Sequence, residues 1–280
     1  CDFNTYEGIE NLISPYINAL EQEIRLWGET LTNSLVSTIF FGGGTPSYLP
    51  VAKTRQILSS ARSSFTVLTD AETTLEVNPD DVTEKKMKNF LDLGVNRLSI
   101  GVQSLDDSLL KLLGRRHTAQ QAITAYKQAR QAGFDKLSID LMYGLPQQTM
   151  NQWQTTLEKA LDLQMPHISL YCLTLEKGTP MERLVLRKTL PNPDNDLAAE
   201  MYMYAVHILK KTGYSHYEIS NWAFPGYECQ HNITYWDNQP YLGVGPGAHS
   251  YIDGYRFHQV KSPRLYIDKV RQWANRGAQT

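Results

Sequence analysis

Cysteine is scarce in this chain, which has only Cys1, Cys172 and Cys229 among its 280 residues. An odd number of widely spaced cysteines excludes the disulfide framework that holds small secreted domains together. The same scarcity favours a reducing compartment, and we therefore expect a cytoplasmic protein. Cys172 and Cys229 are predicted to be buried thiols without a functional role.

Charge runs and long apolar runs are also missing. The 27 lysine and arginine residues nearly balance the 29 acidic ones, and no basic run would release counterions from a nucleic acid. We therefore predict no nucleic-acid partner. No apolar run approaches the roughly 20 residues that cross a bilayer, so we predict a soluble chain that is not itself transmembrane. With 41% apolar residues, the chain has enough for a large core.

What the chain does contain is an alternation of short β-rich runs with longer helical patterns. Strands are predicted at Ser37–Phe41, Thr73–Val77, Arg97–Ile100, Lys136–Met142 and His167–Tyr171. Helices are predicted at Asn11–Trp27, Val51–Ser63, Thr83–Leu93, Thr118–Ala132 and Asn151–Leu163. Such alternation implies a parallel sheet covered by helices, either as a barrel or as an open doubly wound sheet.

Polar residues at the predicted strand ends favour the barrel, because a (βα) barrel gathers its functional groups at the carboxyl ends of its strands. These residues are Gly42–Thr45, Glu76, Asn78, Gln103, Asp140, Tyr171 and Thr174. The fold class is therefore predicted as α/β, a partial (βα)6-type TIM-like barrel with parallel strands. Its sixth strand would precede Cys1. The rhythm changes after Pro191, so residues 1–190 are assigned to the barrel and residues 191–280 to an α+β extension.

Two groups of residues could hold a ligand. The segment Gly42–Thr45 follows a strand and lets backbone groups approach a ligand closely, although a tight turn explains it as well. It lacks the lysine of a phosphate-binding loop and does not fit the dinucleotide fingerprint. Glu76 and Asp140 could accept hydrogen bonds from a ribose diol or an ammonium group, and Arg115 could clamp a carboxylate. Taken singly, each of these three could equally be a surface ion pair or a helix cap.

Together these motifs resemble the radical S-adenosylmethionine superfamily, in the branch of the oxygen-independent coproporphyrinogen III oxidase and the HemW heme chaperone. The resemblance implies a 4Fe-4S cluster held by a C-x3-C-x2-C motif, and Cys1 resembles the third of these cysteines. It also implies that S-adenosylmethionine contacts a set of residues scattered along the first half of the chain. They are Gly43, Gly44, Thr45, Glu76, Gln103, Arg115 and Asp140. We expect the first two cysteines and a strand to precede Cys1.

Within that branch, two features resemble the chaperone group rather than the oxidase. Phe3 stands where the oxidase has a further cysteine, and the run from His231 to Trp236 matches an H-N-x-x-Y-W signature. His231 and Tyr235 share a face in either a strand or a helix, and both side-chain types ligate haem iron. A packed aromatic segment is the alternative.

The resemblance implies a heme chaperone that binds haem and transfers it to an acceptor protein, which can be membrane-associated, with help from an electron donor. The alternative is an oxygen-independent coproporphyrinogen III oxidase that decarboxylates propionates oxidatively, so whether the chain is an enzyme stays open. A third reading is a barrel that binds some other adenosyl ligand. His117 and His167 are interpreted as satisfied structural residues.

Overall fold

The computed structural model describes residue 6 and residues 8–277, which fall into two compact units. The central unit is Thr74–Cys229. The terminal unit combines the described residues before Thr74 with those after Cys229. Strand β2 (Thr66–Val77) passes from the terminal unit into the central one.

Seven strands form one sheet in the order β1-β2-β3-β4-β5-β7-β6. Besides β2, they are β1 (Leu35–Phe41), β3 (Arg97–Gln103), β4 (Lys136–Tyr143), β5 (His167–Cys172), β6 (Ser215–Glu218) and β7 (Asn221–Ala223). Strands β2 to β5 pair in parallel, whereas β7 is antiparallel to both β5 and β6. Parallel pairing brings the carboxyl ends of β2 to β5 to one edge of the sheet.

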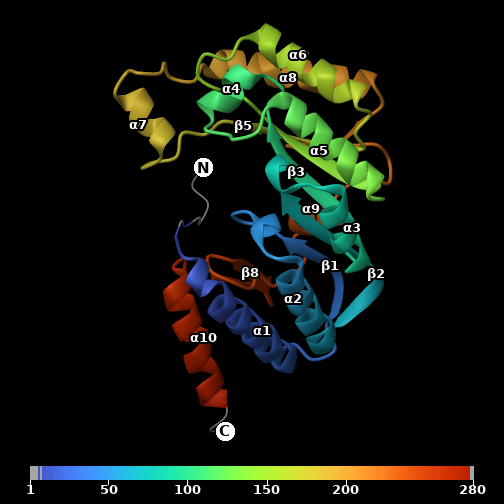
Figure 1. The fold of residues 1–280 in the computed structure, drawn as a ribbon, viewed down its shortest axis with the longest axis vertical. Coiled ribbons are helices and arrows are strands. Elements are labelled where there is room, and N and C mark those ends of the chain that lie inside the picture. Colours follow the sequence, from blue (N-terminus) through green and yellow to red (C-terminus); the bar gives the residue numbers. More distant parts are fainter. Residues whose placement is uncertain (1–5, 7, 278–280) are drawn as a thin grey trace. The chain divides into compact units, whose positions relative to one another are not determined.

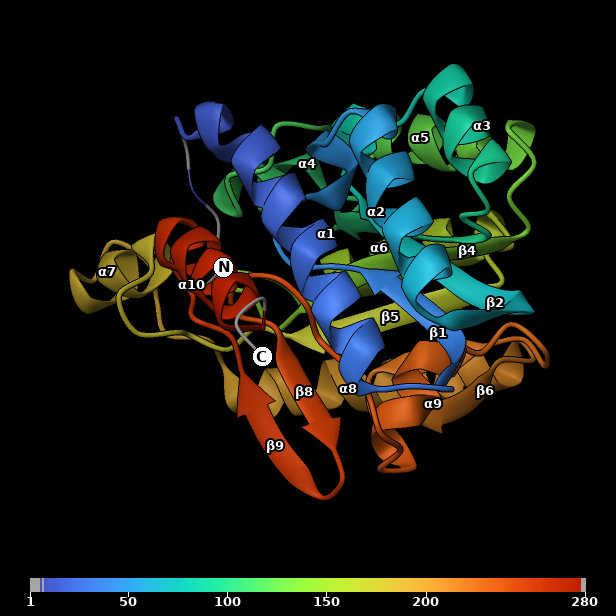
Figure 2. The same ribbon diagram turned by 90° about the horizontal axis from the view of Figure 1, so that it is seen from below.

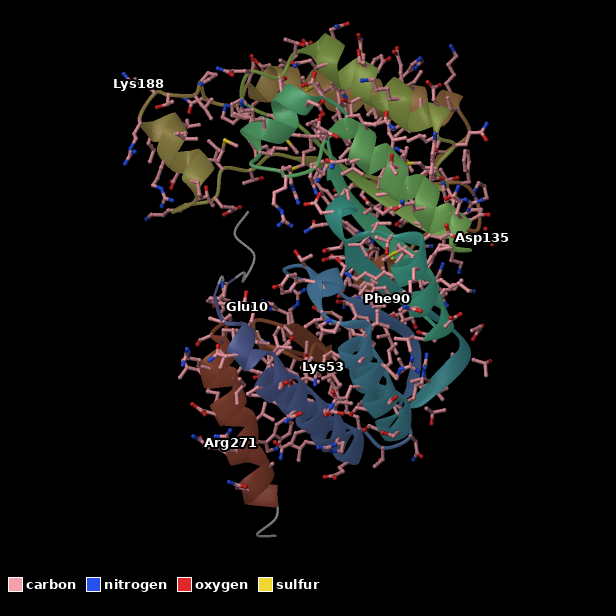
Figure 3. The ribbon with its side chains drawn as sticks, viewed as in Figure 1. Glu10, Lys53, Phe90, Asp135, Lys188 and Arg271 are labelled. Carbon is pink, nitrogen blue, oxygen red and sulfur yellow. The ribbon has the colours of Figure 1, made fainter. Side chains whose placement is uncertain are left out.

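Helices follow each of the parallel strands of the central unit along the chain (Figure 1). They are the short η3 (Pro79–Asp81), α3 (Glu84–Asp92), α4 (Asp107–Leu112), α5 (Ala119–Gln131), α6 (Met150–Asp162), α7 (Pro180–Leu186) and α8 (Asn195–Lys211). The sequence starts several of these helices with a capping threonine. Thr118 and Thr149 each form a complete capping box with a glutamine three residues later. Phe90 on α3 is completely buried, and Figure 3 labels its position.

Alternation along the strands gives the central sheet two different faces. Leu98, Ile100, Leu137, Ile139 and Ile168 are fully buried and lie on one face. The intervening residues are polar, which is unusual because barrel interiors are commonly filled by branched apolar side chains. We call this second side of β3, β4 and β5 the polar face.

The terminal unit packs helices around its own apolar core. Its elements are η1 (Glu10–Leu12), α1 (Ile13–Thr30), η2 (Pro46–Tyr48), α2 (Val51–Ser64), α9 (Gln230–Trp236), the hairpin of β8 (His249–Ile252) and β9 (Tyr255–His258), and α10 (Pro263–Gly277). Helix α1 packs against both α2 and α10 (Figure 2). The core includes Ile17, Leu20, Ile57, Tyr266 and Val270.

The five predicted strands and five predicted helices are confirmed, with ends that differ by a few residues. The main difference is β2, which begins seven residues earlier than predicted, at Thr66. Residues 66–70 are mostly exposed and do not alternate between apolar and polar, so periodicity gave no signal there. The short helices α4 and α7 were not predicted from the sequence either. The domain boundary between residues 190 and 191 stays a prediction.

Candidate functional site

The polar face of the central sheet is built by strand register. Asp140 on β4 lies beside Ser169 on β5, and Ser138 lies between Ser99 on β3 and His167 on β5. Residues two apart on a strand share a face, so these five side chains meet on the same side. The polar face therefore concentrates hydroxyls, one carboxylate and one imidazole in the centre of the unit.

Asp140 is the carboxylate of this face. The Ser99 hydroxyl donates to both of its oxygens, at 2.9 and 3.1 Å, and Ser169 also bonds to it. Burial raises the pKa of Asp140 to about 6, although these hydrogen bonds and Arg115 pull it down. A carboxylate with few water contacts and fixed donors is well prepared to accept a further hydrogen bond from a ligand hydroxyl.

Arg115 lies in the turn between α4 and α5 and donates to the side-chain oxygen of Asn78 at 3.3 Å. Burial lowers the pKa of Arg115, while the charges of Asp140 and Asp80 oppose that shift. A guanidinium keeps its charge even when partly buried. The site therefore holds a fixed cation near the Asp140 carboxylate, suited to an anionic ligand group.

Gln103 ends β3 at an irregularity in the pairing with β4, and its φ of 68° is in the left-handed region. Gly101 makes room for its side chain. A Cβ atom at Gly101 would stand 3.0 Å from the Gln103 Nε2 atom and 3.7 Å from the Asn78 Oδ1 atom. The β-bulge therefore turns the buried Gln103 amide back toward Asn78, the partner of Arg115.

Glu76 stands one residue before the end of β2, opposite Ser99 on β3. Tyr171, near the end of β5, lies within electrostatic reach of both the Glu76 and the Asp140 carboxylate. Burial raises the pKa of its phenol first, and the charges of Asp140, Glu218 and Glu76 raise it further. Four of the sequence-predicted cofactor residues, Glu76, Gln103, Arg115 and Asp140, thus lie in one polar neighbourhood of the central unit.

The glycine segment belongs to the terminal unit. Gly42, Gly43 and Gly44 follow β1 and are exposed, and Thr45 precedes η2. Gly43 has a φ of 111°, a conformation that side-chain-bearing residues rarely adopt, and a Cβ atom there would meet nothing within 4 Å. Glycine is therefore favoured at position 43 by its backbone conformation and not by a lack of space for a side chain.

Helix α9 carries the H-N-x-x-Y-W run, and its His231 side chain is fixed on several sides. The Nδ1 atom lies 2.8 Å from the Thr38 hydroxyl, and the Nε2 atom lies 2.9 Å from the Tyr235 hydroxyl. The ring stacks on Phe40 with centroids 4.9 Å apart, and the backbone N–H donates to Glu72 at 3.2 Å. Burial lowers the pKa of His231 to about 4, so the imidazole is neutral at pH 7.

The other aromatic residues of α9 are open to solvent. Tyr235 is 46% exposed and Trp236 is 56% exposed, unusual values for large apolar groups that follow one another. Tyr235 also meets Tyr241 edge to face, with centroids 4.6 Å apart. The alternative reading of this segment as a packed aromatic core strand is wrong, because α9 is a helix and these two rings are exposed.

Comparison with known proteins places the chain in a family. The model of the Radical SAM superfamily matches residues 1–160. The Heme chaperone HemW of Lactococcus lactis is 39% identical over 95% of this chain and 69% of its own length. The HemW of Bacillus subtilis is 38% identical over 97% of this chain and 72% of its own length. This chain belongs to the radical SAM superfamily, within the HemW family.

Among solved structures, the coproporphyrinogen III oxidase HemN of Escherichia coli, a radical SAM enzyme, superposes with a TM-score of 0.85 at 25% identity. The match covers 98% of this chain and 66% of HemN. The predicted fold class, a partial parallel barrel with an extension, is confirmed by this likeness. Family membership also implies a 4Fe-4S cluster and S-adenosylmethionine as cofactors.

The described residues fit S-adenosylmethionine but do not test the cluster. Arg115 suits a carboxylate, and Glu76, Asp140 and Gln103 suit hydroxyl and ammonium groups. Cys1, the predicted cluster ligand, lies outside the described residues. Within residues 8–277, no group of three histidine, cysteine or acidic side chains could hold a metal ion.

Several residues behave differently from the sequence-based expectation or were missed by it. Cys229 is buried as predicted, whereas Cys172, the last residue of β5, is exposed. Ser99 and Thr38 were missed. Alternation along β3 puts Ser99 on the polar face, whereas no local pattern connects Thr38 with His231, 193 positions further along the chain. His117 and His167 are satisfied structural residues as expected, bonded to Val102 and to Ser138 and Tyr217.

No helix among the described residues is long and apolar enough to span a membrane.

Proposed function

We propose that this chain is a haem chaperone, which binds haem as its cargo and transfers it to an acceptor protein. Its bacterial relatives carry the name Heme chaperone HemW. The observation that carries the proposal for this chain is α9, where His231 and Tyr235 form a hydrogen-bonded pair beside the exposed Trp236. Imidazole and phenolate are both haem-iron ligands, and an indole offers a flat apolar partner to a macrocycle.

The cofactor site of the proposal uses the residues predicted from the sequence. Arg115 would pair with the S-adenosylmethionine carboxylate, and Asp140 and Glu76 would accept hydrogen bonds from its ribose or ammonium group. Gln103 can donate and accept at once. The backbone of Gly43, Gly44 and Thr45 would approach the methionine part. Cys1 would be the third cluster ligand.

The cluster and S-adenosylmethionine together supply one-electron radical chemistry when bound. The protein's own contribution is positioning: the Ser99 hydroxyl holds the Asp140 carboxylate in place, and Asn78 orients Arg115. Burial of both groups strengthens their interactions with a bound ligand.

Partners follow from the chemistry of cargo and cofactor. Transfer of haem requires an acceptor protein, and that acceptor can be membrane-associated. An electron donor must reduce the cluster. We place the protein in the cytoplasm, with residues 1–190 as the cofactor-binding part and residues 191–280 as the part that contains the haem-binding segment.

The alternative function is oxidative decarboxylation of coproporphyrinogen III. It is favoured by the superposition with HemN of E. coli, a coproporphyrinogen III oxidase. The two functions share a cofactor site and differ in what happens to the tetrapyrrole. One assay therefore separates them.

The test combines turnover and transfer on the same cluster-loaded protein. With a reductant and S-adenosylmethionine, we expect no decarboxylated product from coproporphyrinogen III. We also expect the protein to bind one haem and to deliver it to haem-free apomyoglobin as a probe acceptor. Decarboxylated product would establish the oxidase, and absence of haem binding would overturn the chaperone proposal.

A variant pair tests α9 as the haem site. The double variant H231A/Y235F should lower haem affinity by at least about tenfold, because it removes both candidate ligands. His207→Ala, an exposed histidine on α8 in the central unit, is the matched control and should leave haem affinity unchanged. Equal affinity for the double variant and the control would move the haem site away from α9.

A further inference from the structure

Aromatic contacts in the terminal unit continue beyond α9 and lead to an arginine on the β8–β9 hairpin (Figure 2). Tyr235 meets Tyr241 edge to face, with centroids 4.6 Å apart. The backbones of Tyr241 and Tyr251 exchange hydrogen bonds of 2.8 Å in both directions. Tyr251 on β8 stands directly opposite Arg256 on β9, and the Arg256 guanidinium donates to the Tyr241 hydroxyl at 3.1 Å. We call Tyr241, Tyr251 and Arg256 the tyrosine-arginine strip.

Arg256 carries a charge that no acidic side chain neutralises in the described part of the chain. Its side chain is exposed, and it forms no ion pair with any described residue. A guanidinium stays charged at neutral pH and presents its N–H donors in a planar fork that matches a carboxylate. The Tyr241 hydroxyl accepts from one part of that fork, which leaves other N–H groups for a ligand. The strip therefore offers an oriented cation to an anionic group.

We propose that Arg256 binds a propionate carboxylate of the haem cargo and that Tyr241 is the residue that positions its guanidinium. This inference rests on the proposed haem-binding function. Haem combines a flat apolar macrocycle with charged propionate groups along one edge. The terminal unit presents the matching arrangement, because exposed aromatic rings lie next to a guanidinium that is free to pair with a carboxylate.

The hydrogen bond to Tyr241 prepares Arg256 for this role. An exposed arginine side chain has many rotamers, and fixing it before the ligand arrives lowers the entropy that binding must offset. Arg256 and Tyr251 are cross-strand neighbours, so their side chains lie on the same face of the hairpin. Tyr255, one position earlier on β9, lies on the opposite face. Strand register thus places the charge of Arg256 on the side of the tyrosines.

The test compares ferric haem with its dimethyl ester, in which the propionates carry no charge. Each ligand is titrated into the protein in the same detergent solution and followed by absorbance. The unchanged protein should bind the ester about fivefold more weakly than haem, because the ester cannot form the ion pair. Arg256→Gln should bind haem about fivefold more weakly than the unchanged protein and should no longer distinguish the two ligands. Tyr241→Phe should reduce the preference for haem to about twofold, because the guanidinium loses its fixed position.

Arg264→Gln is the matched control, because Arg264 is another exposed arginine of the terminal unit and its loss changes the net charge equally. It should keep the full preference for haem over the ester, and circular dichroism should be the same for all variants. Equal affinity of the unchanged protein for the two ligands, or an Arg256→Gln variant that weakens both alike, would overturn the inference and leave the chaperone proposal intact. Failure of the unchanged protein to bind either ligand would instead overturn the proposed function, and with it this inference.

Discussion

Asp140 and His231 are ionisable side chains whose pKa values are shifted in opposite directions by their surroundings. Burial disfavours the charged form of each, so the pKa of Asp140 rises to about 6 and that of His231 falls to about 4. The sequence identified both residues as site candidates through motifs. It gave no sign of either shift, because the groups responsible come from other strands.

The raised pKa of Asp140 predicts a pH-dependent stability. The folded protein holds this proton more tightly than the unfolded chain, whose carboxyl has the ordinary pKa of 3.8. The stabilisation from Asp140 is therefore complete below pH 3.8 and is lost as the pH rises through about 6. Asp140→Asn should match the original protein near pH 4 and exceed its unfolding free energy by about 1–2 kcal/mol at pH 7.

Urea denaturation of the cofactor-free protein between pH 4 and pH 8 measures this difference. Asp135→Asn, which changes an exposed carboxylate in the turn after α5, is the control and should show no such trend. Parallel pH curves for the original protein and Asp140→Asn would contradict the prediction.

At the scale of elements, local sequence determined most helix starts and the parallel strands. Thr118 and Thr149 each precede a helix by one residue and have a glutamine three positions later, and both form reciprocal caps. The exposed half of β2 and the short antiparallel strands β6 and β7 lacked such signals, although β6 and β7 pair with each other across a tight turn before β7 pairs with β5.

The capping box of α6 should contribute measurably to stability. The Thr149 hydroxyl accepts from the Gln152 backbone N–H at 3.2 Å, and the Gln152 side chain accepts from the Thr149 N–H at 3.0 Å. Thr149→Ala removes the first bond, so we expect the free energy of unfolding to fall by about 1 kcal/mol. Thermal denaturation monitored by circular dichroism measures it.

Thr124→Ala provides the comparison, because that hydroxyl is exposed on α5 and bonds only to the carbonyl of its own helix. It should change stability by less than about 0.5 kcal/mol. If Thr149→Ala lowered the free energy of unfolding as little as Thr124→Ala does, the cap would contribute nothing measurable to stability.

At the scale of the whole molecule, the terminal unit joins the two ends of the described chain. Glu23 of α1 is fully buried and accepts the backbone N–H of Gly245 at 2.9 Å and the Tyr266 hydroxyl at 2.5 Å. Its other oxygen accepts from Gln259. One carboxylate thus connects α1 to three segments more than 200 positions away, which no local pattern predicts.

Glu23→Gln should destabilise the protein by about 2–4 kcal/mol, since an amide NH2 would face donors instead of accepting from them. Glu21→Gln is the control on the same helix, where only Gln56 donates to the carboxylate and the side chain is partly exposed. Chemical denaturation should separate the two variants clearly. Equal midpoints would mean that the Glu23 network relaxes without cost.

Sequence by itself determined the βα alternation, the family motifs and the residues of the candidate cofactor and haem sites. These features are local or are carried by short spacings, and local propensity and periodicity encode them directly. Only the tertiary structure decided that β3 to β5 present a polar face, that Thr38 and Glu72 hold His231, and that the Tyr235 hydroxyl contacts the His231 ring. Such facts depend on strand register and on contacts between distant segments, because hydrogen bonding and burial are properties of neighbours in space.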